Sequence, residues 1–307
     1  MLPDIKNVLK PRPRKFRNIA RHISPLLLTQ NNNQSALSDS DIYNDLSSSR
    51  GTERFLGLFS KLGVQFALKK FGVFDVLKNS GLQQPEIVLD TKDSYRHKLQ
   101  IIHRIDDKTL LSGELVAQRG IFTHPVLAGS KPEKKQSDLI LVEWLLLQQP
   151  EKSFSRYRPQ LPGQEHPGLG IGQLVYEIMY WTARRDGADG VLIVPNYLHT
   201  GLFYGRQFLF TDPALQGLIY YIENYLLRKY KLDQLTWACS EGQLIEKRSG
   251  EIFRWQPAPM LMPVSPILKD YFNSPEYSNL VQESRKEYRL FINPDYQKKY
   301  DRHWKTK

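Results

Sequence analysis

The stretch that decides the fold runs from Glu165 to Asn196 and reads EHPGLGIGQLVYEIMYWTARRDGADGVLIVPN. Its glycines Gly168, Gly170 and Gly172 come directly before a segment with the apolar spacing of a helix. The letters DGADG end this helix, and VLIVP is short and apolar, as a buried strand requires. The first N–H groups of a helix are unpaired and lie at the positive end of its dipole. The sequence therefore predicts a phosphate site at the glycine loop.

The two common phosphate motifs do not fit this loop. A dinucleotide fold has its glycine loop immediately after a strand and an acidic residue at the end of the next strand. Here the preceding strand ends well before the loop, and the next strand ends in VPN. A P-loop requires Gly-Lys-Ser/Thr, which the sequence lacks. The alternative that the glycines only form a tight turn, which lets the helix approach the sheet, stays open.

The segments before the loop predict an antiparallel meander. Residues 98–105 (KLQIIHRI) alternate as a strand does, and residues 109–122 (TLLSGELVAQRGIF) return after the turn DDK. Residues 139–147 (LILVEWLLL) are continuously apolar, which suits a strand covered on both faces. A helical pattern over residues 55–77 precedes the meander. Together these elements predict an α/β fold.

The segments after the loop predict a further helix and two strands. Asp212 as N-cap and Pro213 at the first position are start signals for a helix. Residues 234–240 (QLTWACS) and 250–256 (GEIFRWQ) have the composition of strands. Residues 29–52 are polar and rich in Ser and Asn, which is typical of a linker.

Composition excludes several classes of protein. Cys239 is the single cysteine, so neither an intramolecular disulfide nor a cysteine-based zinc site is expected, and no metal site is predicted. This fits a reducing compartment, and we expect a cytoplasmic protein. An organellar transit peptide at the Arg-rich start stays an alternative. The longest apolar run, residues 139–147, is too short for a membrane span.

The net charge of +11 is concentrated at the two ends of the chain. A nucleic-acid-binding domain usually carries its charge on a folded binding face. We therefore expect solvated basic arms, and a nucleic acid is a possible but not a favoured partner. The expected organisation is a basic, partly flexible extension over residues 1–52, one domain over residues 53–265 and a basic extension over residues 266–307.

The glycine loop and its helix resemble the acyl-CoA-binding core of the GNAT N-acetyltransferase superfamily. The signature of that family is Gln/Arg-x-x-Gly-x-Gly/Ala at the start of a helix that is followed by a strand, and the match falls at Glu165, Gly168 and Gly170. The resemblance implies a GNAT-like, mixed and mostly antiparallel central sheet flanked by helices. Three positions depart from the pattern, since Glu165 replaces Gln or Arg, Pro167 removes a backbone donor, and Phe208 stands where glycine is usual.

The resemblance also implies the roles of individual residues. Catalytic roles fall to Glu143 as a base, whose pKa would rise if its apolar strand buried it, and to Tyr204 as an acid for the CoA thiolate. A surface-facing Glu143 and an ordinary packed Tyr204 are the alternatives. Arg156 and Arg158 are candidates for the acceptor site or the CoA 3′-phosphate, or are exposed loop charges. The cofactor-binding residues implied are Glu165, His166, Gly168, Leu169, Gly170, Ile171, Gly172 and Asn196.

The resulting prediction is an N-acyltransferase in which an amine attacks acetyl-CoA or another acyl-CoA directly. One alternative is a non-catalytic GNAT-like module that binds acyl-CoA or another phosphate ligand. A second alternative is a basic protein that binds nucleic acid or an anionic surface. The sequence does not identify the amine acceptor, which is a small molecule or a protein, nor the length of the acyl chain or the oligomeric state.

Overall fold

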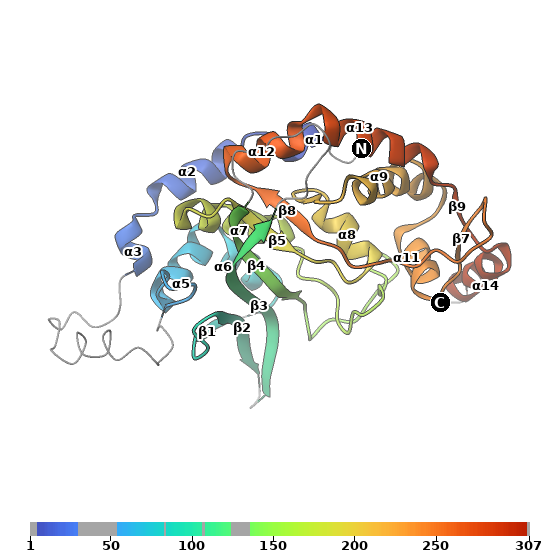
Figure 1. Cartoon of the computed structure of the whole chain (residues 1–307). Coiled ribbons are helices and arrows are strands. Elements are labelled where there is room, and N and C mark those ends of the chain that lie inside the picture. Colours follow the sequence, from blue (N-terminus) through green and yellow to red (C-terminus); the bar gives the residue numbers. More distant parts are fainter. Residues whose placement is uncertain (1–4, 30–53, 83, 106–107, 124–135, 306–307) are drawn as a thin grey trace, which may run out of the picture.

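The computed structural model describes residues 5–29, 54–82, 84–105, 108–123 and 136–305. Within them the chain is a mixed α/β protein. Its seven-stranded, mostly antiparallel sheet has the order β1-β2-β3-β4-β5-β8-β6 (Figure 1). The strands are β1 (Glu86–Asp90), β2 (Arg96–Ile105), β3 (Lys108–Thr123), β4 (Gln136–Leu147), β5 (Gly190–Ile193), β6 (Leu209–Phe210) and β8 (Met260–Pro263), and β7 (Leu244–Glu246) pairs with β9 (Leu290–Ile292) in a second small sheet.

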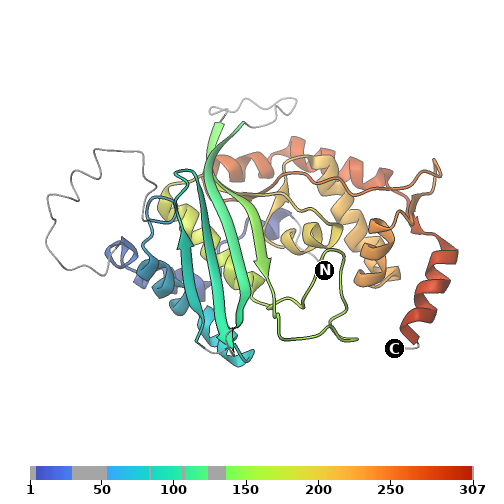
Figure 2. The same cartoon turned by 90° about the horizontal axis from the view of Figure 1, so that it is seen from below.

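Helices cover both faces of the large sheet (Figure 2). The helices are α1 (Ile5–Val8), α2 (Arg14–His22), α3 (Pro25–Thr29), α5 (Lys61–Lys70), α6 (Val73–Asn79), α7 (Gly172–Asp186), α8 (Leu198–Tyr204), α9 (Pro213–Tyr221), the π-helix η1 (Ile222–Leu226), α10 (Leu227–Lys229), α11 (Leu232–Ser240), α12 (Pro266–Asn273), α13 (Pro275–Glu287) and α14 (Pro294–Lys305). On one face α5 and α7 bury sheet residues such as Ile101 and Val142. On the other face α12 and α13 bury Leu139 and Leu261.

The centre of the sheet contains a change of strand direction and a bulge. Strands β1 to β4 are antiparallel neighbours, whereas β4 and β5 are parallel. Val116 pairs with Trp144 and Ala117 pairs with Val142, so Glu143 is the additional residue of a β-bulge in β4. The pairing of β4 with β5 ends at Val142 and Ile193, while β4 continues to Leu147. The two parallel strands therefore separate beyond the bulge.

The strands of the meander and the helix after Asp212 were predicted, and the structure confirms them. The Asp212 carboxylate accepts a hydrogen bond from the Ala214 N–H at 2.8 Å and caps α9. Gly72, with a positive φ of 83°, separates α5 from α6 within the predicted helical region.

Two later predictions are wrong. Residues 234–240 belong to helix α11, because Leu235, Ala238 and Cys239 lie at helical spacing and are buried together. Residues 250–256 form no strand, and only Ile252 makes an isolated bridge, with Ile245. The strand that joins the large sheet is instead β8 (Met260–Pro263), which the sequence analysis did not predict.

The charged ends are not simply solvated arms. Phe16, Ala20 and Ile23 of the N-terminal helices are part of the main core, and the Arg12 side chain is 7% exposed. At the other end, the buried Tyr277 donates a hydrogen bond to the Phe210 carbonyl at 2.6 Å. Residues between the basic ones make these contacts. The net charge of the two segments therefore wrongly predicted that both would be solvated. The predicted linker, residues 29–52, lies almost entirely outside the described residues.

Candidate functional site

The glycine loop forms one wall of a cleft with a volume of about 1180 Å³. The other walls come from the end of β4, the connection over residues 154–167, the starts of α7 and α11, the end of α8 and Tyr300 of α14. The cleft thus lies beside the segment of β4 that has parted from β5.

Backbone hydrogen bonds fix the glycine loop to the end of β4. The Leu169 N–H donates to the Leu147 carbonyl at 3.3 Å, and the Gln149 N–H donates to the Pro167 carbonyl at 2.7 Å. Leu169 and Ile171 point into the protein and are 3% and 1% exposed. These two apolar residues alternate with the glycines. Their side chains pack in the core and hold the loop in place, while the glycines remain at the surface.

Gly170 gives the loop its shape. Its φ is +75°, a conformation that favours glycine, and no heavy atom lies within 4 Å of where a Cβ would be. Helix α7 then begins at Gly172, and its N-cap residue Ile171 makes no side-chain hydrogen bond to the first turn. Since no side chain caps this end, the first N–H groups of α7 are available to an anion in the cleft.

Positively charged side chains surround the same cleft. Arg156, Arg158, Arg206 and Lys231 line it and are exposed. Asp233 is the carboxylate among its lining residues, and it accepts a hydrogen bond from the Tyr300 hydroxyl at 2.8 Å. The excess of positive charge favours an anionic ligand, and it acts in the same direction as the helix dipole.

Tyr204 is the predicted catalytic residue that does lie in the cleft. Its ring packs on two other aromatic rings, T-shaped with Tyr176 at a centroid distance of 6.1 Å and tilted against Phe208 at 6.0 Å. Burial raises the pKa of the Tyr204 phenol to about 12. The hydroxyl therefore keeps its proton at neutral pH and can donate a hydrogen bond to a negative charge in the cleft.

Glu143 is not in the cleft, and the expectation that its strand would bury it is wrong. The residue is exposed, forms an ion pair with Arg96 and accepts a hydrogen bond from Gln118 Nε2 at 2.6 Å. The cause is the β-bulge, which places Glu143 out of the regular alternation of β4. The apolar run of β4 gives no sign of the bulge in its sequence, because the bulge arises from the way in which β4 pairs with β3.

The remaining predicted ligand residues divide into two groups. The structure brings Gly168, Leu169, Gly170 and Gly172 together at the cleft wall. It does not bring these residues to the lining of the cleft: Glu165, His166, Ile171 and Asn196. Ile171 belongs to the core, and Glu165 and Asn196 are exposed but are not among the lining residues.

Sequence reading missed the lining residues that follow the motif. Arg206, Lys231 and Asp233 come from the end of α8 and the start of α11, and Tyr300 comes from α14. Arg206 follows Tyr204 closely, which was a usable signal. No local signal existed for Asp233 and Tyr300, because folding alone brings α11 and α14 to the cleft.

His199 is a buried histidine near the cleft and does not line it. Its ring stacks on Tyr197 with centroids 5.4 Å apart, and burial lowers its pKa to about 4. It is therefore neutral at physiological pH. Within residues 5–29, 54–82, 84–105, 108–123 and 136–305, no three His, Cys, Asp or Glu side chains form a group suited to a metal ion.

Neither a protein-family model nor a curated protein matches the sequence. Among the helices that the structure describes, none has both the length and the apolar character needed to cross a membrane.

Proposed function

We propose that the protein is an acyl-CoA-dependent N-acyltransferase of GNAT-like architecture. The observation that carries the proposal is the uncapped start of α7 with its glycine loop, which faces a cation-lined cleft where the parallel strands β4 and β5 separate. The mixed, mostly antiparallel sheet with helices on its faces agrees with the architecture that the sequence resemblance implies.

The cleft offers a binding group for each part of CoA. The N–H groups from Gly170 to Gln173 suit the pyrophosphate, and the four cations suit the remaining phosphate. Beyond Val142 one edge of β4 is not paired with β5, so its backbone groups can bond to the amides of the pantetheine arm. An extended ligand at this edge would lie beside β4 where β5 is no longer paired with it.

The proposed reaction is direct attack of an amine on the thioester carbonyl. The new C–N bond forms, the C–S bond breaks, and the electron pair of that bond leaves on the CoA sulfur. Tyr204 stabilises the resulting thiolate by donating a hydrogen bond. Full proton transfer from Tyr204 would be uphill, because its pKa of about 12 lies above the usual value of about 8.5 for a thiol. The attacking nitrogen loses its proton to solvent, and the thiolate therefore takes a proton from solvent.

The direct test is thermal denaturation with and without free CoA and acetyl-CoA. A ligand that binds only the native state must raise the midpoint. We expect Gly170→Glu to abolish the shift, since it places a carboxylate at the phosphate site. Gly187→Glu is the matched control, because Gly187 caps the other end of α7 with a φ of +74° and equally open space. Absence of a shift in the wild type at millimolar ligand would overturn the proposal.

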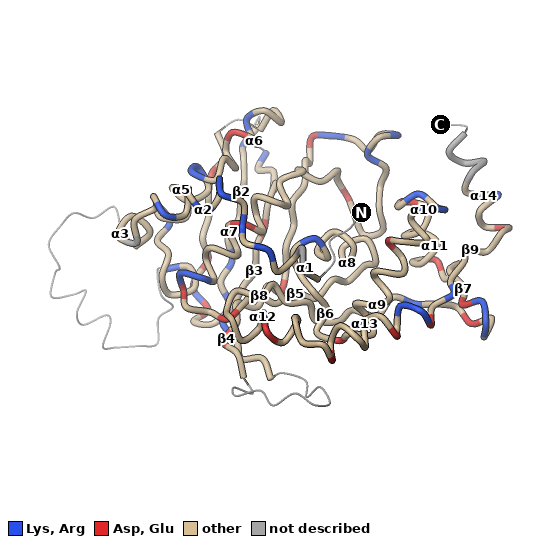
Figure 3. The backbone as a smooth tube through the Cα atoms, turned by 90° about the horizontal axis from the view of Figure 1, so that it is seen from above, with Lys and Arg blue, Asp and Glu red and all other residues tan. Residues whose placement is uncertain are grey.

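A second candidate function rests on the N-terminal helices. Phe16 stacks on Phe71 with centroids 6.1 Å apart, which brings α2 beside the end of α5. Asp75 is the one acidic residue within α2, α3, α5 and α6. Figure 3 shows the Lys and Arg positions along α2 and α5. The exposed cations of these four helices, together with Lys10 before α2, are Lys10, Arg14, Lys15, Arg21, Lys61, Lys69, Lys70 and Lys78.

Such an excess of positive charge suits the phosphate backbone of a nucleic acid. If the protein acts in this way, RNA or DNA binding weakens steeply with salt and survives Gly170→Glu. Replacement of Lys69 and Lys70 by glutamine would reduce the salt dependence. Binding that instead disappears with Gly170→Glu would place the nucleic acid in the cleft and contradict this candidate.

A further inference from the structure

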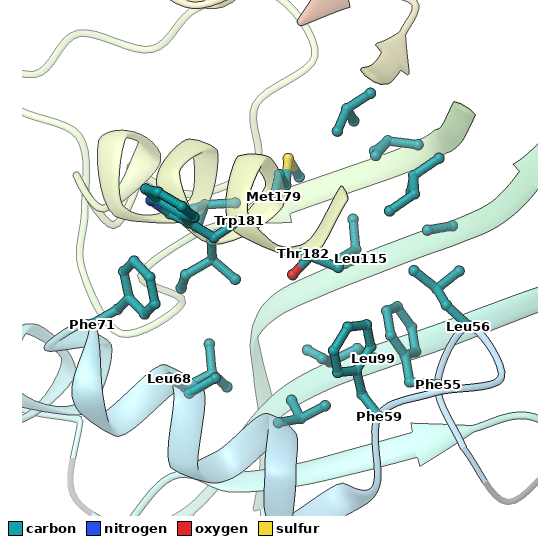
Figure 4. A pocket seen from close by; sticks show the side chains of 18 of the residues that line it. Phe55, Leu56, Phe59, Leu68, Phe71, Leu99, Leu115, Met179, Trp181 and Thr182 are labelled. Carbon is teal, nitrogen blue, oxygen red and sulfur yellow. The ribbon is translucent and has the colours of Figure 1, made fainter. Parts of the chain in front are cut away.

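A separate apolar cavity of about 130 Å³ lies between the sheet and helices α5 and α7. Figure 4 shows Phe55, Phe59 and Leu68 on one side and Met179 and Trp181 of α7 on another. No residue of the cleft's cationic or glycine wall lines this cavity.

The cavity adjoins the cleft. Leu145 and Leu147, both on the part of β4 that has separated from β5, line the cavity and the cleft alike. Val142, the last residue of β4 that pairs with β5, also lines the cavity. A group that enters the cleft along the free edge of β4 thus lies one layer of side chains away from an apolar space.

The lining selects the chemistry of an occupant. Its polar members include Glu114, Thr182 and Arg185, and the Arg185 guanidinium already donates to the carbonyls of Ala20 and Ile23. An apolar space of this kind stays dry and takes an apolar guest, as an engineered cavity of about 150 Å³ takes benzene. The available volume therefore matches about six carbon atoms.

We propose that this cavity receives the acyl chain of the thioester, so that the preferred substrate carries an acyl group of about six carbons. This inference rests on the proposed function of the cleft. Ala20 of α2, Ile23 and Leu28 of α3 also line the cavity, and we expect them to limit the length of the chain.

The test measures dissociation constants for free CoA and for its acetyl, butyryl, hexanoyl and decanoyl thioesters. We expect affinity to rise up to about fourfold for each methylene that enters the cavity, and to stop rising beyond hexanoyl. Equal affinities for acetyl-CoA and hexanoyl-CoA would overturn the inference and leave the proposed function standing. Absence of binding for every thioester and for free CoA would overturn the proposed function and the inference together.

Two variants change the cavity in opposite directions. Ala67→Phe on α5 fills it, and we expect the advantage of hexanoyl-CoA to disappear while free CoA binds as before. Leu115→Ala on β3 enlarges it, and we expect the preference to move toward decanoyl-CoA. Destabilisation alone lowers the midpoint of both variants and does not move the preference for chain length in opposite directions. A preference that stays at the same chain length in both variants contradicts the inference.

Discussion

Arg12 and Glu177 form an ion pair inside the protein, with 3.4 Å between Nη1 and Oε1 and side chains that are 7% and 0% exposed. The Arg12 guanidinium also lies 4.2 Å from the centroid of the Tyr180 ring and donates a hydrogen bond to Gln207. The pair thus connects the segment before α2 to the middle of α7 and, through Gln207, to the wall of the cleft.

Arg12→Met should destabilise the protein by about 3 to 5 kcal/mol, because it leaves the Glu177 carboxylate buried without a partner. Burial raises the pKa of Glu177, and Arg12 opposes this rise. Without Arg12 the pKa of Glu177 goes higher still. A raised folded-state pKa gives stability that is present at low pH and lost as pH increases, so the deficit of the variant should shrink on acidification. Urea unfolding at several pH values measures this.

The control for that experiment is the double variant Arg12→Met with Glu177→Met. Removing both charges should restore most of the lost stability, since two apolar groups replace a buried ion pair. A double variant as unstable as Arg12→Met would show that the contact with Tyr180, and not the ion pair, holds this segment.

The buried His199 predicts a loss of stability at acidic pH. Burial lowers its pKa from the ordinary 6.5 to about 4, so the unfolded chain binds the proton more tightly. Stability from this group is therefore complete above pH 6.5 and is lost as pH falls through about 4, by about 3 kcal/mol in total. His199→Phe keeps the stacking on Tyr197 and should flatten this part of the pH profile. An unchanged slope in unfolding experiments between these pH values would contradict the assignment.

Tyr204→Phe should lower kcat between about 10- and 150-fold, the value of a hydrogen bond to a charged group, with little change in CoA affinity. Glu143→Gln serves as the comparison, because Glu143 lies outside the cleft and pairs with Arg96. We expect its kcat to match the wild type in steady-state assays with a panel of amines. A large loss of kcat in Glu143→Gln would indicate that Glu143, in the bulge of β4, is the catalytic base.

Asp212→Ala should lower stability by about 1 kcal/mol through loss of the cap on α9. For a chain of 307 residues the melting midpoint should fall by about 1 to 2 °C. Asp212→Asn, which retains an oxygen acceptor, should stay close to the wild type. Calorimetry of the three proteins checks this, and an equal loss in both variants would argue against the 2.8 Å hydrogen bond as the cause.

Local patterns were enough to predict the elements whose signals lie within one segment. The alternation in β2, the glycines before α7 and the Asp212–Pro213 start of α9 all appear in the structure. Residues 234–240 were wrongly predicted as a strand, because β-branched and aromatic side chains are frequent in strands. Their burial follows a helical spacing.

The residues of the site also differ in whether the sequence could predict them. The glycine loop could be predicted because the loop and the helix that follows it are contiguous in the sequence. The position of Glu143 was not, since it depends on which residue of β4 has no partner in β3. Asp233 and Tyr300 meet only after α11 and α14 have folded against each other, and neither residue carries a local signal.

The ion pair between Arg12 and Glu177 has a consequence for synthesis on the ribosome. Its two partners are separated by 165 positions. At ordinary rates of translation Arg12 therefore waits roughly 10 to 30 seconds before Glu177 emerges. During that time Phe71 and other residues of the same core have already been made, so the apolar side of α2 can be covered while Arg12 still lacks its carboxylate. The ion pair of the N-terminal segment with α7 therefore becomes possible later in synthesis than the contact of the same segment with α5.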